Sequence, residues 1–160
     1  MSYSEAVGAI SDEQGGFRKH RGCPDQILIF REILGSRKER KLPTFTTFVD
    51  VRKAYDTVWR EKAYVAMHDA GINGKLWRQL QKMHNGLTRR VMHPLGFTDP
   101  FDVLRGVAQG AVESPWVYSI FIDGLAQALK RAGHGIMVAG RRVPLLMYAD
   151  DIVLLASTQQ

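Results

Sequence analysis

The sequence predicts a mixed α/β fold in which short strands alternate with helices, and three observations carry that prediction. The run Thr44–Val51 (TFTTFVDV) is rich in β-forming residues and roughly alternates in polarity, as a strand does. Ser114-Pro115 is typical of a helix start, and apolar positions continue after it to about Ala132. The run Leu145–Leu155 places two acids between two short apolar segments, which predicts a hairpin with the acids at its tip.

The other expected elements follow from periodicity, prolines and glycines. Pro24 favours a first helix with Ile27, Phe30 and Leu34 on one face. The charged segment 35–41 is expected to be a solvated loop. The sequence further predicts a helix over Arg60–Ala70 and a helix from Asn73 to Gly86, whose inner side is lined by Leu76, Leu80 and Met83. It also predicts a hairpin within 89–105 and two short β runs around Gly140–Arg142. The helix 114–132 is expected to have an apolar face made of Val117, Phe121, Leu125, Ala128 and Leu129.

The composition excludes several classes of protein. Lys and Arg number 22 against 16 Asp and Glu, so the net charge is +6, and 160 residues with 45% apolar content suffice for one domain with a core. One cysteine rules out a disulfide framework. No apolar run reaches the roughly 18 residues of a membrane span, and residues 1–16 do not read as a signal peptide. We therefore expect an intracellular protein, nuclear or cytoplasmic, without a membrane partner. The positive charge suits nucleic acid, although many basic proteins bind none.

The most informative feature is the acid pair Asp150-Asp151 between two apolar β runs. Asp is common in turns, so a plain hairpin turn is one interpretation. Tight hairpins prefer Gly or Asn at their tips, whereas Tyr148 and Ala149 precede this pair and Ile152 follows it. Two adjacent carboxylates repel each other, so a site that holds them together needs a compensating cation. The pair therefore favours a metal site over a plain turn.

A second acid fits the same hypothesis. Asp50 lies near the end of the strand predicted over 44–51, where a carboxylate is costly unless it is paired or bound to a metal; the alternative is a strand-end residue that caps a loop. If the two strands are neighbours in one sheet, Asp50, Asp150 and Asp151 converge. Such a cluster suits Mg²⁺, which takes one or two protein carboxylates and leaves other positions to substrate phosphates and water.

Four blocks of sequence stand out, and they are Gln14–Gly22 (QGGFRKHRG) with Asp25-Gln26-Ile27, Phe48–Asp56 (FVDVRKAYD), Arg105–Gly110 (RGVAQG) with Ser114-Pro115, and Tyr148–Asp151 (YADD). In this order, the blocks resemble those of reverse transcriptases, and they are most similar to the non-LTR (LINE-type) retrotransposon class. The resemblance implies a polymerase palm, which is a small antiparallel sheet that carries the acids and is backed by helices (α+β in the stricter sense), with a fragment of the fingers. The acid pair alone is a weak signal, whereas four ordered blocks are a strong one.

The resemblance implies an RNA-directed DNA polymerase that adds dNTPs to a DNA primer on an RNA template. Asp50 and Asp150 would bind two Mg²⁺ ions, which Mn²⁺ can replace, with the Val51 carbonyl as a further ligand and Asp151 completing the cluster. One ion would activate the primer 3′-hydroxyl, and the other would hold the triphosphate and stabilise the departing pyrophosphate.

Three further positions match the nucleotide site of the family. Tyr55 matches the residue whose ring packs under the incoming sugar and rejects a 2′-hydroxyl; from the residues alone, a core tyrosine is the simpler interpretation. Gln109 and Gly110 match residues that approach the nascent base pair, and a turn before a helix gives the same pattern. Basic side chains that could contact template phosphates, or form a solvated loop, are Arg18, Lys19 and Arg21.

Against the family pattern, the chain corresponds to a partial domain: about 14–40 between fingers and palm, and about 41–160 for the palm. The upstream fingers hairpin and the downstream thumb are not in it, so we expect little processive synthesis from this chain alone. The alternative is a catalytically inactive palm remnant that binds nucleic acid or protein. A metal-dependent nuclease or phosphohydrolase built on the same acids would cleave without adding nucleotides.

Overall fold

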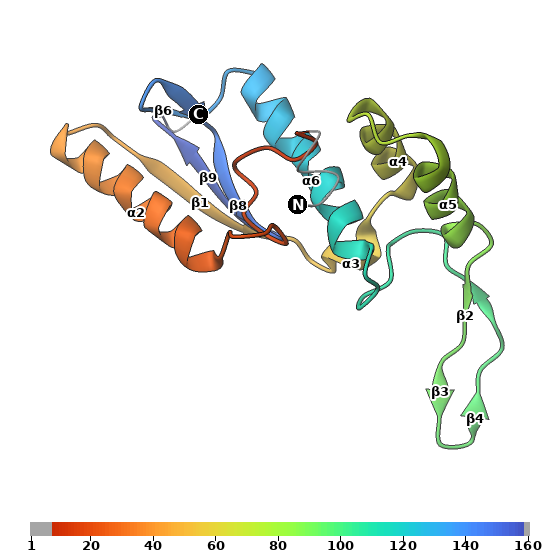
Figure 1. Ribbon diagram of the computed structural model, residues 1–160. Helices are drawn as coiled ribbons and strands as arrows, with labels where there is room; N and C mark the ends of the chain where they lie inside the picture. The colour runs from red at the N-terminus through yellow and green to blue at the C-terminus, as the bar shows by residue number, and fades with distance from the viewer. Residues whose placement is uncertain (1–7, 159–160) are drawn as a thin grey trace.

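The centre of the fold is a three-stranded antiparallel sheet with the strand order β1-β9-β8 (Figure 1). The computed structural model describes residues 8–158. In the sheet, Asp50 is the cross-strand partner of Asp151, which in turn pairs with Tyr148. The predicted strand, the predicted hairpin and the antiparallel arrangement are confirmed. The strands are β1 (Phe45–Asp50), β8 (Leu145–Tyr148) and β9 (Asp151–Ala156).

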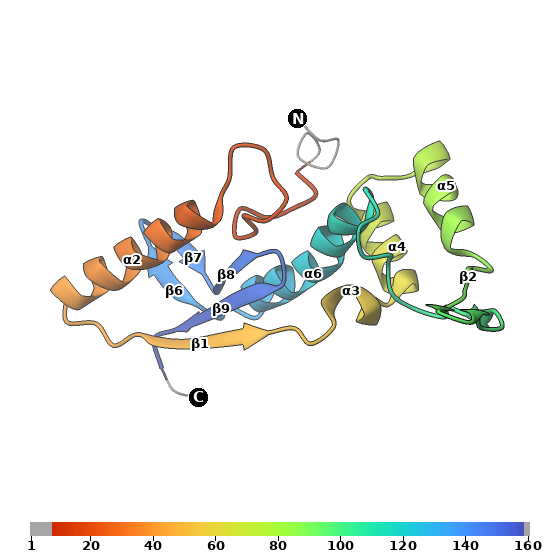
Figure 2. The same ribbon diagram turned by 90° about the horizontal axis from the view of Figure 1, so that it is seen from below.

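Helices and short strand pairs surround this sheet. One long arm, formed by β2 to β5, extends away from the rest of the molecule in Figure 1, and Figure 2 views this arm nearly end-on beside α5. The hairpin predicted within 89–105 is confirmed as this arm. The elements are α2 (Cys23–Glu39), α3 (Ala54–Thr57), α4 (Arg60–Asp69), α5 (Gly74–His84), α6 (Ser114–Arg131), β2 (Thr88–Arg89) paired with β5 (Phe101–Asp102), β3 (Met92–His93) paired with β4 (Gly96–Phe97), and β6 (Ile136–Val138) paired with β7 (Arg141–Val143).

The two faces of the sheet pack against different elements through apolar side chains that alternate along the strands. One face packs against Ala126 and other residues of α6, and the opposite face packs against Ile33 of α2 and Ile136 of β6. Because side chains alternate between faces along a strand, Asp50, Asp151 and Tyr148 belong to the α2 face. The α6 face carries Leu145, Met147 and Ile152, and the α2 face carries Leu146, Val153 and Leu155.

A second core lies among α3, α4, α5 and α6. Val58, Ala63, Met67 and Val117 are completely buried there. Since α6 contributes to this core and to the sheet face, it fixes α3 and the loop before α6 relative to the strands that carry the acids. Among the described helices, none has the length and apolar character that a membrane span requires.

The first helix is longer than the sequence predicts, because α2 continues through most of the segment 35–41 that we expected to be a loop. Arg37 is buried, and its guanidinium donates to Thr44 Oγ1 at 2.6 Å. Basic side chains near a helix C-terminus also interact favourably with the helix dipole. The charged segment therefore continues the helix and ties its end to the start of β1.

The inner faces of two helices also differ from the prediction. In α5, Leu76 and Met83 are exposed, whereas Leu80 and His84 are buried, because Trp77 turns inward and donates its indole N–H to the Tyr64 carbonyl at 3.0 Å. In α6, Val117 is buried as predicted, but Leu125 and Ala128 are exposed. The buried face of α6 consists of Ser114, Val117, Tyr118, Ser119, Ile120, Asp123 and Ala126.

The buried ring of His84 makes the fold sensitive to acid. Tyr64 Oη lies 2.7 Å from His84 Nδ1, and Arg60 donates to the His84 carbonyl at 2.7 Å. Burial, and to a lesser extent Arg60, lower the pKa of His84 from its ordinary 6.5, while Glu113 opposes them. Below about pH 6.5 the unfolded state therefore binds more protons than the folded state, so stability is lost as the pH falls toward the folded pKa.

We expect His84→Gln to be less acid-sensitive than the natural protein. At pH 7.5 it should be destabilised by about 1–3 kcal/mol, because the Tyr64 hydroxyl loses its partner. Between pH 7.5 and pH 5 its free energy of unfolding should then fall less than that of the natural protein. Urea titrations at the two pH values measure both effects, and equal acid losses in the two proteins would contradict the prediction.

Candidate active site

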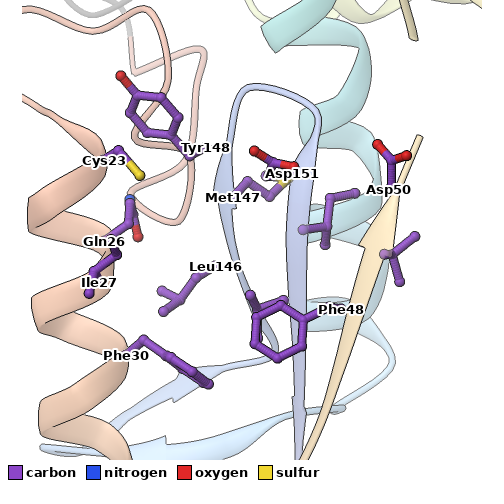
Figure 3. A pocket seen from close by; sticks show the side chains of 13 residues that line it. Cys23, Gln26, Ile27, Phe30, Phe48, Asp50, Leu146, Met147, Tyr148 and Asp151 are labelled. Atoms are coloured by element: carbon purple, nitrogen blue, oxygen red, sulfur yellow. The ribbon is translucent and has the colours of Figure 1, made fainter. Parts of the chain in front are cut away.

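Asp50 and Asp151 lie side by side at one end of the sheet. They are direct cross-strand partners on β1 and β9, both are exposed, and Figure 3 shows their carboxylates at the same end of the two strands. Neither forms a salt bridge to another described residue. Like charges directly opposite each other in a sheet are destabilising. This pair is therefore a repulsive arrangement that a bound cation would relieve.

Asp150 occupies the two-residue turn that joins β8 to β9. Ala149, the other residue of the turn, has a φ of 59°, a conformation that favours glycine. Asp150 is half-buried, and its charge helps to raise the pKa of Tyr55 and of Tyr118. The structure thus brings all three predicted acids to one end of the sheet, with the Asp150 charge felt by two tyrosines.

The acids do not form a closed metal cage. Within residues 8–158, no three His, Cys, Asp or Glu side chains are arranged to hold a metal ion by themselves. A closed structural site has all of its ligands from the protein, whereas a hard cation such as Mg²⁺ shares its coordination sphere with phosphates and water. The available donors, carboxylate oxygens at an open sheet end, suit a divalent cation that also holds a substrate.

Tyr55 lies beside this acidic end and stacks on Tyr118. Their ring centroids are 5.3 Å apart with an interplanar angle of 19°. Tyr118 is completely buried, and its hydroxyl has no hydrogen-bond partner among the described residues. Burial first, and then the charge of Asp150, raise the pKa values of both tyrosines. Both hydroxyl groups are therefore protonated near pH 7, and the buried ring of Tyr118 supports the ring of Tyr55 through this stacking contact.

The loop before α6 is held against α3, next to Tyr55. Val107 N–H donates to the Tyr55 carbonyl and Gly106 N–H donates to the Val58 carbonyl, both at 2.9 Å. Gly106 has a φ of 85° and no room for a Cβ, which would lie 2.7 Å from the Asp56 carbonyl oxygen. Gln109 and Gly110 follow on the exposed part of the loop. The predicted nucleotide-binding positions are thus carried by one anchored loop and by α3, to which it is tied.

The three predicted basic contacts have different surroundings. Arg18 donates to the carbonyls of Ser11 and Gln14 at 2.9 and 3.3 Å. Arg21 donates to the carbonyl and the carboxylate of Asp12 at 2.8 and 2.9 Å. Lys19 is exposed. Both arginines therefore stabilise the segment that contains them, and Lys19 presents its charge to solvent.

A mostly apolar cleft of about 370 Å³ runs from the acids along the α2 face of the sheet. Figure 3 shows α2 side chains on one wall and those of β1, β8 and β9 on the other. A ligand in this cleft would reach the Asp50–Asp151 pair from the side. Its walls include Cys23, Gln26, Phe30, Phe48, Asp50 and Asp151.

Two residues of this region were not assigned a role from the sequence. Tyr118 follows Pro115 by one helical turn, and the predicted apolar face of the helix pointed to its neighbour Val117 instead. Gln14 stands before two glycines in the first family block, and its side chain is completely buried against the β8–β9 turn. The sequence signal that could have pointed to a role for Gln14 is the polar amide directly before two glycines.

Comparison with known proteins agrees with this geometry. Residues 3–160 match the family model described as reverse transcriptase (RNA-dependent DNA polymerase). The chain is 28% identical over 153 residues to the Retrovirus-related Pol polyprotein from type-1 retrotransposable element R2 of Popillia japonica, with 94% of this chain and 22% of that protein covered.

Two further relatives come from Drosophila. The chain is 25% identical over 158 residues to the RNA-directed DNA polymerase from mobile element jockey of Drosophila funebris, with 99% of this chain and 17% of that protein covered. It is 28% identical over 158 residues to the probable RNA-directed DNA polymerase from transposon BS of Drosophila melanogaster, with 93% of this chain and 16% of that protein covered. The chain thus spans 16–22% of the length of these non-LTR retrotransposon proteins. As the order of its motifs predicts, the chain belongs to the reverse transcriptase (RNA-dependent DNA polymerase) family.

Proposed function

We propose that this chain is the palm portion of an RNA-directed DNA polymerase of the non-LTR type, which adds deoxynucleotides to a primer 3′-hydroxyl on an RNA template. The observation that carries the proposal is the cross-strand pair Asp50–Asp151, next to the turn that holds Asp150. Such a pair of facing carboxylates at an open sheet end is unfavourable by itself, and a bound cation would relieve the repulsion. The family match supports the same chemistry.

Reverse transcriptases use divalent metal ions, and in this proposal the ions are two Mg²⁺, which Mn²⁺ can replace. Asp50 and Asp150 would hold them with the Val51 carbonyl, and Asp151 would add negative charge to the cluster. Bound there, such ions would supply a Lewis acid for the primer hydroxyl and positive charge for the departing pyrophosphate. The contribution of the chain is mainly to position these carboxylates in advance.

The nucleotide site of the proposal lies next to the acids. Tyr55 packs under the deoxyribose of the incoming dNTP, and its ring is supported from below by Tyr118. Gln109 and Gly110 approach the nascent base pair from the loop that is anchored to the Tyr55 carbonyl through Val107. The segment 18–21, with Lys19 exposed, offers positive charge to the phosphates of the template or primer.

The test is addition of one deoxynucleotide to a labelled DNA primer annealed to an RNA template. With the 160-residue chain we expect a product that requires Mg²⁺ or Mn²⁺ and is lost in EDTA, with little processive synthesis. A folded chain that binds the primer–template but never extends it would contradict the enzymatic proposal and favour a nucleic-acid-binding palm remnant. Cleavage without nucleotide addition would favour a nuclease.

Replacement of Tyr55 tests the proposed sugar selection. In Tyr55→Val the space under the sugar opens, so the preference for a dNTP over the matching rNTP should fall by about 10–100-fold, the size of effect that pocket shape alone supplies. Relative incorporation efficiencies of the two nucleotides measure it. Tyr118→Phe is the matched control, because it keeps the stacked ring and removes only the unpartnered hydroxyl. An unchanged preference in Tyr55→Val would exclude Tyr55 as the selecting residue.

A further inference from the structure

The turn that carries Asp150 is held by a side chain from the other end of the chain. Gln14 is completely buried, and its Nε2 donates to the Ala149 carbonyl at 3.0 Å. Its Oε1 accepts from the Ala149 N–H at 2.9 Å and from the Gly16 N–H at 2.8 Å. Both N–H groups are obligate donors, which fixes the orientation of the amide. One glutamine therefore satisfies both backbone groups of Ala149.

Ala149 needs such support because its backbone is strained. With a φ of 59°, it occupies the left-handed region that a residue with a Cβ adopts at a cost. The turn is also the only covalent link between β8 and β9, so any other conformation of Ala149 would redirect Asp150, the next residue. The two Gln14–Ala149 hydrogen bonds are present only in the observed conformation and stabilise it against the alternatives.

Gln14 is itself presented by an anchored segment. Gly15 N–H donates to the Met147 carbonyl and Met147 N–H donates to the Glu13 carbonyl, both at 2.8 Å, so residues 13–15 run alongside β8. Glu13 is buried and forms an ion pair with Lys130 of α6 at 2.6 Å. Ser11 N–H donates to the buried carboxylate of Asp123, also on α6, at 2.9 Å. The amide is thus fixed relative to both the sheet and α6.

We propose that Gln14 is a positioning residue, which holds the Ala149–Asp150 turn so that the Asp150 carboxylate stands ready to bind a divalent cation beside Asp50. This inference rests on the metal site of the proposed function. Gln14 is completely buried, so it acts through the backbone of Ala149. Supporting groups around metal ligands commonly contribute about 10–100-fold to metal affinity.

The test compares Gln14→Met with Gln81→Met. Methionine keeps the length of the side chain but cannot make the three hydrogen bonds, and Gln81 is a half-buried glutamine on α5, which packs against α4. Two readouts are taken under conditions in which circular dichroism shows every variant to be fully folded. The first is hydrogen exchange of the Ala149 amide by NMR. The second is Mn²⁺ affinity from the electron paramagnetic resonance signal of free Mn²⁺.

In Gln14→Met we expect protection of the Ala149 amide to fall at least 10-fold and Mn²⁺ affinity to fall about 10-fold, whereas Gln81→Met should leave both within about twofold. Adding Ala149→Gly to Gln14→Met should recover at least about threefold in affinity, because glycine adopts the positive φ without support. A general loss of stability would not be rescued in this way. Unchanged Ala149 protection and Mn²⁺ affinity in Gln14→Met would overturn the proposal.

Two further controls keep the result interpretable. If Gln14→Met does not fold, Gln14→Asn tests the same point, because the shorter side chain keeps a polar amide but cannot reach the N–H and the carbonyl of Ala149 together; unchanged exchange and affinity would again overturn the proposal. If Asp50→Asn binds Mn²⁺ as tightly as the natural chain, the proposed metal site is wrong. The exchange of the Ala149 amide then still decides whether Gln14 holds the turn.

Discussion

Asp50→Asn is expected to abolish metal-dependent nucleotide addition and, in the absence of metal, to make the protein more stable. The two effects have one cause. Asp50 faces Asp151 directly across the β1–β9 pair, and facing like charges are unfavourable by roughly 0.2–1 kcal/mol. The asparagine removes this repulsion, so the free energy of unfolding in EDTA should rise by a few tenths of a kcal/mol. The same change removes a metal ligand, and nucleotide addition should fall by at least about 100-fold.

Metal should reverse the order of stability. A ligand that binds only the folded state stabilises it by RT ln(1 + [L]/Kd), so saturating Mn²⁺ should raise the melting temperature of the natural chain and leave that of Asp50→Asn nearly unchanged. Asp102→Asn is the matched control, since Asp102 is also an exposed strand residue but lies on the β2–β5 arm. Calorimetry in EDTA and in Mn²⁺ measures the melting temperatures of the natural chain and of both variants. If Asp50→Asn were destabilised in EDTA, the two carboxylates would not repel each other in the folded protein. If Mn²⁺ stabilised Asp50→Asn as much as the natural chain, Asp50 would not be a metal ligand.

The acidic end of the sheet could be predicted because its determinants are local. The hairpin follows from two apolar runs around Asp150-Asp151, and the strand of Asp50 from its β-rich composition. Only the pairing of the two strands required information beyond periodicity, and the order of the family motifs supplied it. The structure confirms this pairing in the register Asp50–Asp151.

The errors arose where a tertiary hydrogen bond decides the local structure. Segment 35–41 is charged and contains a glycine, which favours a loop, yet the bond from Arg37 to Thr44 stabilises its helical form. The face of α5 was misplaced because the indole of Trp77 bonds to α4. The spacing of apolar side chains along the sequence does not reveal such hydrogen bonds between different elements.

The role inferred for Gln14 could not be predicted from the sequence. Its partner Ala149 is 135 residues away, and the bonds go to backbone groups, so the identity of the partner residue carries no signal. What the sequence does show is the pair of glycines after Gln14. Their meaning becomes clear only in the structure, where the chain at Gly16 approaches the turn too closely for a side chain.

Gly16→Ala is therefore expected to be among the most destabilising single-methyl changes in the chain. A Cβ at Gly16 would overlap the backbone nitrogen of Ala149 and lie 2.8 Å from its Cα. Both atoms belong to a turn that Gln14 and the β8–β9 ladder hold in place, so neither can move without loss of these bonds. Overpacking of this kind typically costs about 1–3 kcal/mol, and here the displaced backbone also carries Asp150.

Gly124→Ala provides the opposite expectation for the same chemical change. Gly124 lies within α6, it is exposed, and a Cβ there meets no atom within 4 Å. Alanine in a helix is favoured over glycine by roughly 0.5–1 kcal/mol, so this variant should be more stable than the natural chain. Urea unfolding of both variants measures the contrast. Because the added methyl group is identical, opposite signs would assign the loss in Gly16→Ala to the contact with the Ala149 backbone, and a Gly16→Ala protein as stable as the natural chain would show that the turn is not packed as described.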